Sequence, residues 1–399
     1  MRVAIFTDGF YPELGGIQDS VQLLAKTLGG RGHQVLCVVP SASPSDYALS
    51  HVPEKEIDLG KNVRITRVPS LLVKGSNLQS RLVLPTFTRW RLLREFKPDI
   101  IHTQTFFGLG IEALRASRKL RIPMVGTNHS AVREFMVYAP FAAELLGRLT
   151  LKAVIWYYNR CDFVTGPSHS VLDEMAQYGL KAPHEPVSNP IDTTIFQKRT
   201  REERDALKKK FGFSDSTVIY AGRLGREKNI DVLLRAIGQV RAKIPNAMLA
   251  LAGHGRDEAR LRALVTELGI EKSVRFLGTL SQAALAEAYA ASEVFSIAST
   301  SETQSMVLLQ AFICGLPAVS ADWRSLHEYT PETAGFRARS LDSADFAQKM
   351  TTLLQDSELR EQLGEGAYRF GSQFSPEAVA AVWERVYADT IARAQAGRA

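Results

Sequence analysis

Short apolar runs alternate with helix-like segments along almost the whole chain. Residues 2–7 form the first run, followed by a glycine-rich loop and a helix-like segment at residues 18–28. The remaining strand-like runs are residues 34–39, 100–102, 124–127, 162–165, 217–220, 248–252, 274–277, 294–297 and 318–320. This alternation is typical of α/β domains built on parallel sheets.

The length of the chain indicates how many such domains to expect. A chain of 399 residues is too long for one ordinary core. A turn at residues 189–192 is followed by a polar, charged stretch at residues 198–210. We therefore expect two doubly wound Rossmann-like domains, residues 1–192 and 193–374, which face a ligand cleft at the carboxyl ends of their strands. A last helix opens with Ser375 as its cap and Pro376 at its first position, and we expect residues 375–399 to pack back on the first domain.

Composition narrows the class of protein. With 45% apolar and 23% charged residues, the chain is typical of a folded, soluble protein. No apolar run reaches the ~20 residues that span a bilayer, and the N-terminal run is too short for a signal peptide. Cys37, Cys161 and Cys314 are scattered and have no metal-ligand spacing, so we expect buried thiols in a reducing compartment. These features predict a cytoplasmic protein.

Two basic residues follow the strand-like run at residues 217–220. Gly222 and Arg223 come almost directly after it, and Lys228 follows five residues later. Cations at the end of a strand can hold a diphosphate and stabilise negative charge that develops on it. Taken alone, such a pair more often only faces water. Gly253 makes a tight turn after the next run, at the same predicted edge of the sheet.

A polar loop with a single carboxylate turns directly into an apolar helix. The loop contains Glu302, Thr303, Gln304 and Ser305, and the helix begins near Met306. The first turn of a helix presents free backbone N–H groups, which can bind a phosphate. Because parallel strands end at one edge of a sheet, we expect this helix start to lie near the basic pair, and this makes the pair more than a solvated surface.

Polar residues and glycines also follow strand-like runs in the first half of the chain. They are Tyr11, Gly15 and Gly16 after the first run, His102 at the end of residues 100–102, and Asn128 and His129 after residues 124–127. Adjacent glycines let the backbone approach a diphosphate closely, although such a pair is more often only a turn. A lone histidine at a strand end is more often structural, but two at equivalent edges favour a site.

Together these motifs resemble the retaining glycosyltransferases of family 4, which have the GT-B fold. The resemblance covers nearly the whole chain and is most specific at residues 222–229 and 300–317. It implies that Arg223 and Lys228 hold the diphosphate of a nucleotide-diphosphate sugar and that Glu302 lies near its sugar. It places Gly15, Gly16, Gly222, Gly253, Thr303, Gln304, Ser305, Met306 and Gln310 on the donor side. It places Tyr11, His102, Asn128 and His129 on the acceptor side, with His129 near the reacting sugar.

The resemblance also implies a reaction, that of a hexosyltransferase of EC class 2.4. The nucleotide diphosphate leaves while the acceptor hydroxyl attacks the same face of the sugar, with the leaving phosphate as base. We expect no cofactor and no metal, because the chain has no Asp-any-Asp pair and no histidine cluster. The basic pair and the helix start would stabilise the departing charge instead.

Two positions depart from the family pattern. The family has a second glutamate, which binds the nucleotide ribose, where this chain has Gln310. A glutamine keeps one acceptor and adds two donors, so we expect donor binding to weaken by roughly 1–2 kcal/mol. Ser305, where the family often has glycine, would add bulk beside the phosphates. A nucleotide-sugar-binding protein with reduced turnover is therefore an alternative, against which the remaining site residues argue because all of them are present.

The net charge of +7 is concentrated in one segment. Between residues 61 and 97, nine basic side chains face one acid, Glu95, and large apolar residues are interleaved with them. The basic residues are Lys61, Arg64, Arg67, Lys74, Arg81, Arg89, Arg91, Arg94 and Lys97. This pattern predicts contact with an anionic membrane surface, although a solvated helix face is the alternative. No nucleic-acid motif accompanies the charge, so we expect no nucleic-acid partner.

The loop at residues 302–304 and the turn at residues 188–192 look most like the branch that glucosylates diacylglycerol or mannosylates phosphatidylinositol. The resemblance therefore favours UDP-glucose as donor and a lipid acceptor such as diacylglycerol. It implies a peripheral protein of glycolipid biosynthesis at the inner face of the cell membrane. A soluble acceptor, such as a sugar phosphate, is the alternative, because acceptor pockets vary far more than donor pockets on one fold.

Overall fold

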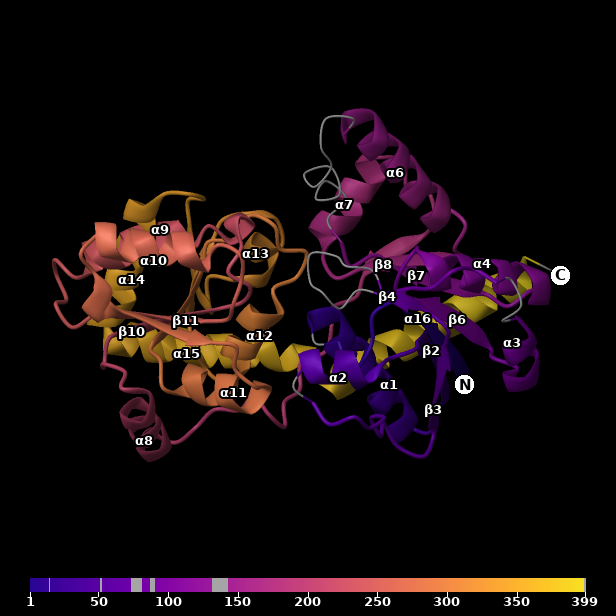
Figure 1. The fold of residues 1–399 in the computed structure, drawn as a ribbon, viewed down its shortest axis with the longest axis horizontal. Coiled ribbons are helices and arrows are strands. Elements are labelled where there is room, and N and C mark those ends of the chain that lie inside the picture. The colour runs from indigo at the N-terminus through magenta and orange to yellow at the C-terminus, as the bar shows by residue number, and fades with distance from the viewer. Residues whose placement is uncertain (14, 51, 73–80, 87–89, 131–142, 398–399) are drawn as a thin grey trace. The chain divides into compact units, whose positions relative to one another are not determined.

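The computed structural model describes the chain except residues 14, 51, 73–80, 87–89, 131–142 and 398–399. It contains two compact units, each with its own sheet (Figure 1). Unit 1 is Met1–Pro190 together with Pro376–Ala399, and unit 2 is Ile191–Ser375. The last helix, α16 (Pro376–Ala396), therefore belongs to unit 1, where it packs against α1 (Gly16–Gly30).

A seven-stranded sheet forms the centre of unit 1. Its order is β3-β2-β1-β6-β7-β8-β9, and all its neighbouring strands are parallel. The strands are β1 (Arg2–Phe6), β2 (Gln34–Pro40), β3 (Val63–Val68), β6 (Ile100–Thr103), β7 (Met124–Thr127), β8 (Phe163–Gly166) and β9 (His184–Pro186). A short antiparallel hairpin, β4 (Leu71–Leu72) with β5 (Arg81–Leu82), forms a second sheet. Helices bury both faces of the central strands, and this is why those strands are continuous apolar runs.

The helices of unit 1 cover two separate cores. Besides α1 and α16, the helices among the described residues of this unit are α2 (Pro44–Leu49), α3 (Trp90–Phe96), α4 (Gly108–Leu120), α6 (Ala143–Tyr158) and α7 (His169–Gln177). One core joins Phe6 of β1 to Leu109 of α4, and the other joins Ile5 of β1 to Trp383 of α16. Successive residues of a strand face opposite ways, so neighbouring residues of β1 enter different cores.

A six-stranded parallel sheet forms the centre of unit 2, in the order β12-β11-β10-β13-β14-β15. Its strands are β10 (Thr217–Ala221), β11 (Met248–Ala252), β12 (Val274–Gly278), β13 (Val294–Ile297), β14 (Ala318–Ala321) and β15 (Gly335–Ala338). Its α-helices are α8 (Arg201–Phe211), α9 (Ile230–Val240), α10 (Glu258–Glu267), α11 (Gln282–Ala290), α12 (Met306–Ile313), α13 (Arg324–Tyr329), α14 (Ser343–Gln355) and α15 (Ser357–Gly371). In Figure 1, α9 and α14 pack together on one side of this sheet and α12 and α15 on the other.

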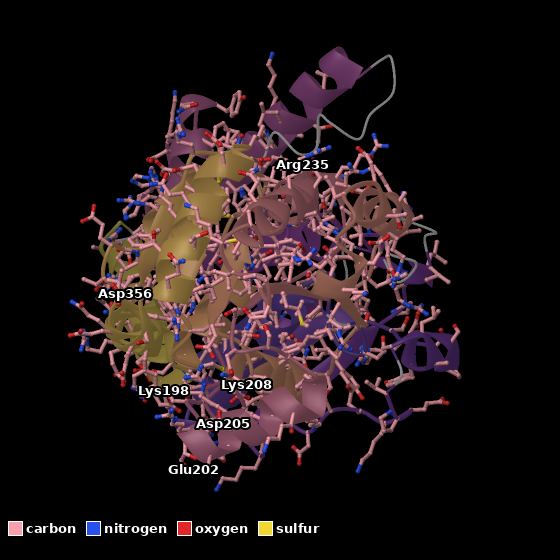
Figure 2. All side chains as sticks on the ribbon, turned by 90° about the vertical axis from the view of Figure 1, so that its left-hand side faces the viewer. Lys198, Glu202, Asp205, Lys208, Arg235 and Asp356 are labelled. Atoms are coloured by element: carbon pink, nitrogen blue, oxygen red, sulfur yellow. The ribbon has the colours of Figure 1, made fainter. Side chains whose placement is uncertain are left out.

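Helix α8, which contains most of the polar stretch predicted to mark the domain boundary, is held to unit 2 by ion pairs as well as by apolar contact. None of its residues is fully buried, but Leu207 and Phe211 are half-buried and pack against the core of unit 2. Glu293, at the start of β13 and 7% exposed, pairs with Arg204 (3.3 Å) and Lys208 (2.7 Å) of α8 and with Arg360 of α15 (3.0 Å). Figure 2 shows Lys208 and Asp205 on α8 at the surface of unit 2. A helix with so few apolar residues gains from such ion pairs.

The strand order of both sheets marks where ligands bind on such folds. Counted along the chain, the strands of unit 2 run 3-2-1-4-5-6, and those of unit 1 begin with the same order. In doubly wound sheets, ligands bind at the carboxyl ends of the strands where this order reverses. The reversal lies between β10 and β13 in unit 2 and between β1 and β6 in unit 1.

Candidate active site

The loops after β10 and β11 approach each other closely at the carboxyl edge of the unit 2 sheet. Gly222 and Gly253 follow the two strands with φ angles of 139° and 138°. A Cβ atom on Gly253 would lie 1.9 Å from the carbonyl oxygen of Gly222. Both the backbone angle and the contact exclude a larger residue at Gly253, so the turn predicted there has a structural reason.

Lys228 and Glu302 meet at the same edge, from the loops after β10 and β13. The Lys228 Nζ atom lies 2.8 Å from Glu302 Oε1 and donates to Ser301 Oγ at 3.2 Å. Both charged side chains are only 14% exposed. The two residues that sequence spacing predicted to be neighbours are thus in direct contact, although 74 positions separate them.

Asn229 fixes this arrangement, and the sequence analysis did not single it out. It has a φ of 48°, and its side-chain amide donates to the carbonyl of Ala298 and to Thr300 Oγ1, both at 3.1 Å. Asparagine tolerates this left-handed backbone better than most residues. The contact ties the loop after β10 to the loop after β13, which carries Glu302. The position of Asn229 directly after Lys228 is the sequence signal that could have identified it.

Arg223 is the outer cation of the site. Its side chain is 52% exposed and lies 3.1 Å from Glu227, another residue that the sequence analysis passed over. The Tyr220 hydroxyl donates to the Arg223 carbonyl at 2.9 Å, which fixes the turn of the loop. Each cation thus has a carboxylate partner, Lys228 in a half-buried setting and Arg223 in a more exposed one. Cations oriented in this way can bind a diphosphate with charge-assisted hydrogen bonds.

Helix α12 starts at this edge of the sheet. Ser305 caps it by accepting a hydrogen bond from the Leu308 N–H at 3.4 Å, and Ser305 is 1% exposed. The Ser305 side chain is therefore part of the helix cap, and its effect on a bound phosphate stays a prediction. Gln304 is buried, and Thr303 and Met306 are half-buried.

Gln310 lies one turn further along α12. Its side-chain oxygen Oε1 is buried and has no hydrogen-bond partner among the residues that the structure describes. A buried acceptor without a donor costs free energy, so a donor from a ligand would be favourable here. A ribose hydroxyl could donate a hydrogen bond to this oxygen.

His129 follows β7 in unit 1 and is held by Gln104. The His129 Nε2 atom lies 2.6 Å from Gln104 Oε1. Because an amide oxygen only accepts, Nε2 carries the proton, and Nδ1 of the neutral ring is an acceptor. Burial lowers the pKa of His129 to about 4, so the ring is neutral at pH 7. The sequence analysis missed Gln104, although it lies two residues after His102 at the end of the adjacent strand β6.

His102 lies behind this position rather than at a surface. It is 0% exposed, and its two ring nitrogens lie 2.8 Å from the Tyr387 hydroxyl and 2.7 Å from Thr127 Oγ1. Burial, and then the nearby His129, lower the pKa of His102 to about 3. His102 was expected on the acceptor side, but it cannot contact an acceptor directly because its side chain is fully buried. Its position instead supports Gln104, whose amide nitrogen lies 3.1 Å from His102 Nε2.

The other residues expected on the acceptor side differ in exposure. Asn128 is 2% exposed and donates to the Ser130 carbonyl at 3.0 Å, so it shapes the turn that presents His129. Tyr11 is half-buried, and its ring packs edge-on against Tyr47 at a centroid distance of 5.8 Å.

The glycines of the first loop lie at the start of α1. Gly15 has a φ of 168°, an extended angle that any residue adopts, and α1 begins at Gly16. The atoms nearest to a Cβ atom on Gly15 would be those of the Gln18 side chain, the first at 2.6 Å. Neither the backbone angle nor a backbone contact therefore requires glycine at position 15, and the role of Gly15 and Gly16 toward a diphosphate stays a prediction.

The basic segment predicted for a membrane divides into two groups. Arg67 and Arg81 turn inward and pair with Glu56 and Asp46, which corrects their expected place on the outer surface. The outward group consists of Lys61, Arg64, Arg91, Arg94 and Lys97. Lys74 and Arg89 lie outside the described residues.

In the part of the chain that the structure describes, no three His, Cys, Asp or Glu side chains are grouped so that they could hold a metal ion. No helix within the same residues is both long and apolar enough to cross a membrane. The independence of a metal stays a prediction. The three cysteines are free thiols: burial raises the pKa of Cys37 and Cys314 to about 12 and raises that of Cys161 further.

Two solved structures share this fold. HepE from Anabaena, determined with UDP, superposes with a TM-score of 0.76 over 98% of this chain and 100% of its own, at 19% identity. The sucrose-phosphate synthase of Thermosynechococcus elongatus gives a TM-score of 0.75 over 98% and 99% of the two chains, also at 19% identity. The expected pair of parallel α/β sheets is confirmed.

Curated relatives are similar over most of their length. The alpha-monoglucosyldiacylglycerol synthase of Streptococcus pneumoniae is 27% identical over 325 residues, which cover 80% of this chain and 71% of that protein. The GDP-mannose-dependent alpha-mannosyltransferase of Mycobacterium tuberculosis is 28% identical over 326 residues, which cover 81% and 79%.

Two family models match the chain in succession. The model described as Glycosyltransferase Family 4 matches residues 14–195, and the model described as Glycosyl transferases group 1 matches residues 203–370. Together they leave only the two ends and a short stretch between them unmatched. The chain therefore belongs to glycosyltransferase family 4 and has the GT-B fold.

Proposed function

We propose that this protein transfers a hexose from a nucleotide-diphosphate sugar, with UDP-glucose as the favoured donor, to a lipid acceptor such as diacylglycerol, with retention of configuration. The observation that carries the donor half of this proposal is the contact of Lys228 with Glu302. It joins a cation and a carboxylate at the reversal point of the unit 2 sheet, beside the start of α12. This edge is where a doubly wound sheet binds a nucleotide.

Different residues of unit 2 bind different parts of the donor in this proposal. Arg223, Lys228 and the first N–H groups of α12 bind the diphosphate, and their interactions strengthen as negative charge grows on it. Lys228 releases Glu302 in part when the phosphate arrives, and the carboxylate then lies beside the sugar. Gln310 Oε1, which has no partner among the described residues, accepts from a ribose hydroxyl.

The proposed transfer takes place in one step, without a covalent bond between the sugar and the enzyme. The bond from the anomeric carbon to the diphosphate breaks, and the acceptor oxygen forms its bond on the same face. The proton of the acceptor hydroxyl passes to the leaving phosphate. His129, which is neutral with an acceptor nitrogen, orients the reacting sugar.

The lipid half of the proposal is supported by the surface of unit 1. The β4–β5 hairpin and the residues after it expose Leu71 (58%), Leu72 (46%), Leu82 (41%) and Leu84 (55%). Exposed cations on α3, Arg91 and Arg94, come from the same basic segment. Exposed leucines and exposed cations from one segment of the chain suit an anionic membrane interface. The curated relatives include alpha-monoglucosyldiacylglycerol synthases from two organisms, which agrees with a peripheral enzyme of glycolipid synthesis at the inner face of the cell membrane.

A donor and acceptor screen tests the proposal. UDP-glucose, UDP-galactose and GDP-mannose are each offered with vesicles that contain diacylglycerol, and with glucose 6-phosphate as a soluble acceptor. We expect transfer from UDP-glucose to the vesicles, and an α-linkage by NMR of the product. GDP-mannose as the better donor would overturn the donor assignment, whereas transfer only to the soluble acceptor would overturn the lipid assignment. Binding of UDP-glucose without turnover on any acceptor would make the chain a binding protein.

A further inference from the structure

A pocket of unit 1 lies between α3 and α4, two helices that pack against each other (Figure 1). Its lining on α4 includes Glu112, Arg115, Ala116 and Lys119, at the three- and four-residue spacing that places side chains on one face of a helix. Trp90 lines the pocket from α3. The volume of the pocket is about 290 Å³, which suits a small ligand group.

Three cations lie against the ring of Trp90, and we call these four residues the Trp90 cluster. The Lys119 Nζ atom lies 3.9 Å from the ring centroid, and the guanidinium carbons of Arg94 and Arg91 lie 4.5 Å and 5.8 Å from it. Because all three charges are held near one point, they repel one another. An anion bound among them would relieve this repulsion.

The cations of the Trp90 cluster are not neutralised by the protein. Among the residues that the structure describes, Arg91, Arg94 and Lys119 form no ion pair with a carboxylate. Glu95, the acid of α3, lies 3.4 Å from Arg64 instead. A cation–π contact orients a cation but leaves its charge in place. The positive charge of the cluster is therefore available to an anionic ligand.

Glu112 is the acid among the lining residues, and it is already engaged. Its side chain accepts hydrogen bonds from the backbone N–H of Thr86 and from the Thr86 hydroxyl, the latter at 3.2 Å. Glu112 is 1% exposed, whereas Arg115, one turn further along α4, is exposed. The open part of the pocket thus presents more positive than negative charge.

The pocket also lies near an exposed leucine. Thr86, which binds Glu112, follows Leu84 by two residues, and Leu84 is 55% exposed. Two residues span at most about 7 Å, so Leu84 lies close to the segment that meets the pocket lining. A ligand with acyl chains would therefore find an apolar side chain near the pocket.

We propose that this pocket binds a phosphate group, with Lys119 and Arg94 donating to its oxygens beside the ring of Trp90. An ionised phosphate only accepts hydrogen bonds, and the ammonium and guanidinium groups only donate them. The phosphate is that of an anionic phospholipid head group or of a soluble phosphate ester. The inference goes beyond the proposed transfer reaction, because this phosphate is neither the donor diphosphate nor the acceptor hydroxyl.

Vesicles of equal surface charge distinguish a phosphate site from general attraction to anions. Vesicles of digalactosyldiacylglycerol, which contains no phosphate, carry either phosphatidic acid or oleic acid, adjusted to the same zeta potential. UDP is present throughout to fill the donor site. We expect the unmodified protein to bind the phosphatidic acid vesicles at least about fivefold more tightly, because oleate supplies the charge but not the phosphate.

Soluble phosphates show the source of the group. Inorganic phosphate and glycerol 3-phosphate are titrated by calorimetry, again with UDP present. Binding of either one at millimolar concentration would support the site with a soluble ligand, whereas a preference for phosphatidic acid alone would support a lipid head group. Equal binding to both vesicles, together with no binding of the soluble phosphates, would overturn the inference.

The variant Lys119→Ala tests the pocket itself, with Arg118→Ala as matched control. Both residues are exposed cations of α4, but only Lys119 lines the pocket and lies against Trp90. Loss of one surface cation should weaken binding to both kinds of vesicle equally, so Arg118→Ala should keep the preference for phosphate. Lys119→Ala should abolish that preference and any binding of soluble phosphate, while UDP binding stays unchanged. A preference that survives in Lys119→Ala, or that Arg118→Ala removes as well, would overturn the inference.

Discussion

At the scale of single residues, the departure at Gln310 has a definite structural setting. The residue lies on α12, and its amide oxygen is buried without a partner among the described residues. Ser305, the other departure, caps this helix. The two substitutions therefore leave the start of α12 intact and change only the chemistry of one acceptor.

The variant Gln310→Glu should tighten nucleotide-sugar binding by about tenfold at most, since a carboxylate accepts from both ribose hydroxyls and glutamine already accepts from one. Calorimetric titration of UDP into both proteins measures this change, and Gln177→Glu on the surface of unit 1 controls for added charge. Weaker binding by Gln310→Glu would mean that the pocket suits the amide, and would favour a specialised donor.

Gln104 sets the protonation of His129. In Gln104→Glu, a carboxylate replaces the amide oxygen 2.6 Å from Nε2, and a nearby negative charge favours the protonated imidazole. The pKa of His129 should rise from about 4, so the acid limb of the kcat/KM profile should move up by about one pH unit or more. A profile that keeps its shape while the rate falls would show that Gln104 has only a packing role.

At the scale of elements, the hairpin and α3 should bind the membrane together. Replacing Leu72 and Leu84 by Asp should abolish flotation with anionic vesicles, because both side chains are exposed and apolar. Reversing Arg91 and Arg94 should weaken flotation in a salt-dependent way, since screening acts within ~8 Å at physiological ionic strength. Leu341→Asp in unit 2, where the leucine is 61% exposed, is the control. Unchanged flotation in both sets would show that this surface is merely solvated.

The sequence predicted the central strands well and the edges poorly. The runs at residues 2–7 and 217–220 match β1 and β10 because parallel strands buried on both faces are continuous apolar runs. Strand β3, with the sequence VRITRV, is only half-buried. Because it contains two arginines, it was assigned to the basic segment and not predicted as a strand. The β4–β5 hairpin was missed because two-residue strands have no measurable period.

The same limit applies to the site. Residues at strand ends could be placed because topology brings parallel strand ends to one edge, and Lys228 and Glu302 meet there. The inward turn of Arg81 and the burial of His102 depend on partners far along the chain. Asp46 lies 35 positions from Arg81, and Tyr387 lies 285 positions from His102. Spacing alone cannot give such pairs.

At the scale of the whole molecule, two buried neutral histidines make stability depend on pH. Burial lowers the pKa of His102 to about 3 and that of His129 to about 4, whereas both titrate near 6.5 in the unfolded chain. Between pH 6.5 and 4 the unfolded chain binds more protons, so the free energy of unfolding falls as the pH falls. Each histidine should cost about 2 kcal/mol between pH 7 and pH 5.

Urea midpoints at the two pH values check this dependence. His129→Gln should reduce the loss of stability on acidification, and His254→Gln, which alters a 74% exposed ring, should not. A pH dependence that is the same in all three proteins would show that other groups cause it.

Lys228 has the central role in the proposed reaction, since it stabilises the charge of the leaving diphosphate. The rate of glucose transfer from UDP-glucose to diacylglycerol vesicles tests it in Lys228→Ala, with Arg226→Ala as control. Both cations belong to one short 3-10 turn, but Lys228 is 14% exposed and paired with Glu302, whereas Arg226 is 86% exposed. We predict a loss of kcat/KM of about a hundredfold or more for Lys228→Ala, since an interaction that strengthens in the transition state is removed, and a change of less than about twofold for Arg226→Ala. Near-normal turnover of Lys228→Ala, or an equal loss in both variants, would contradict the account.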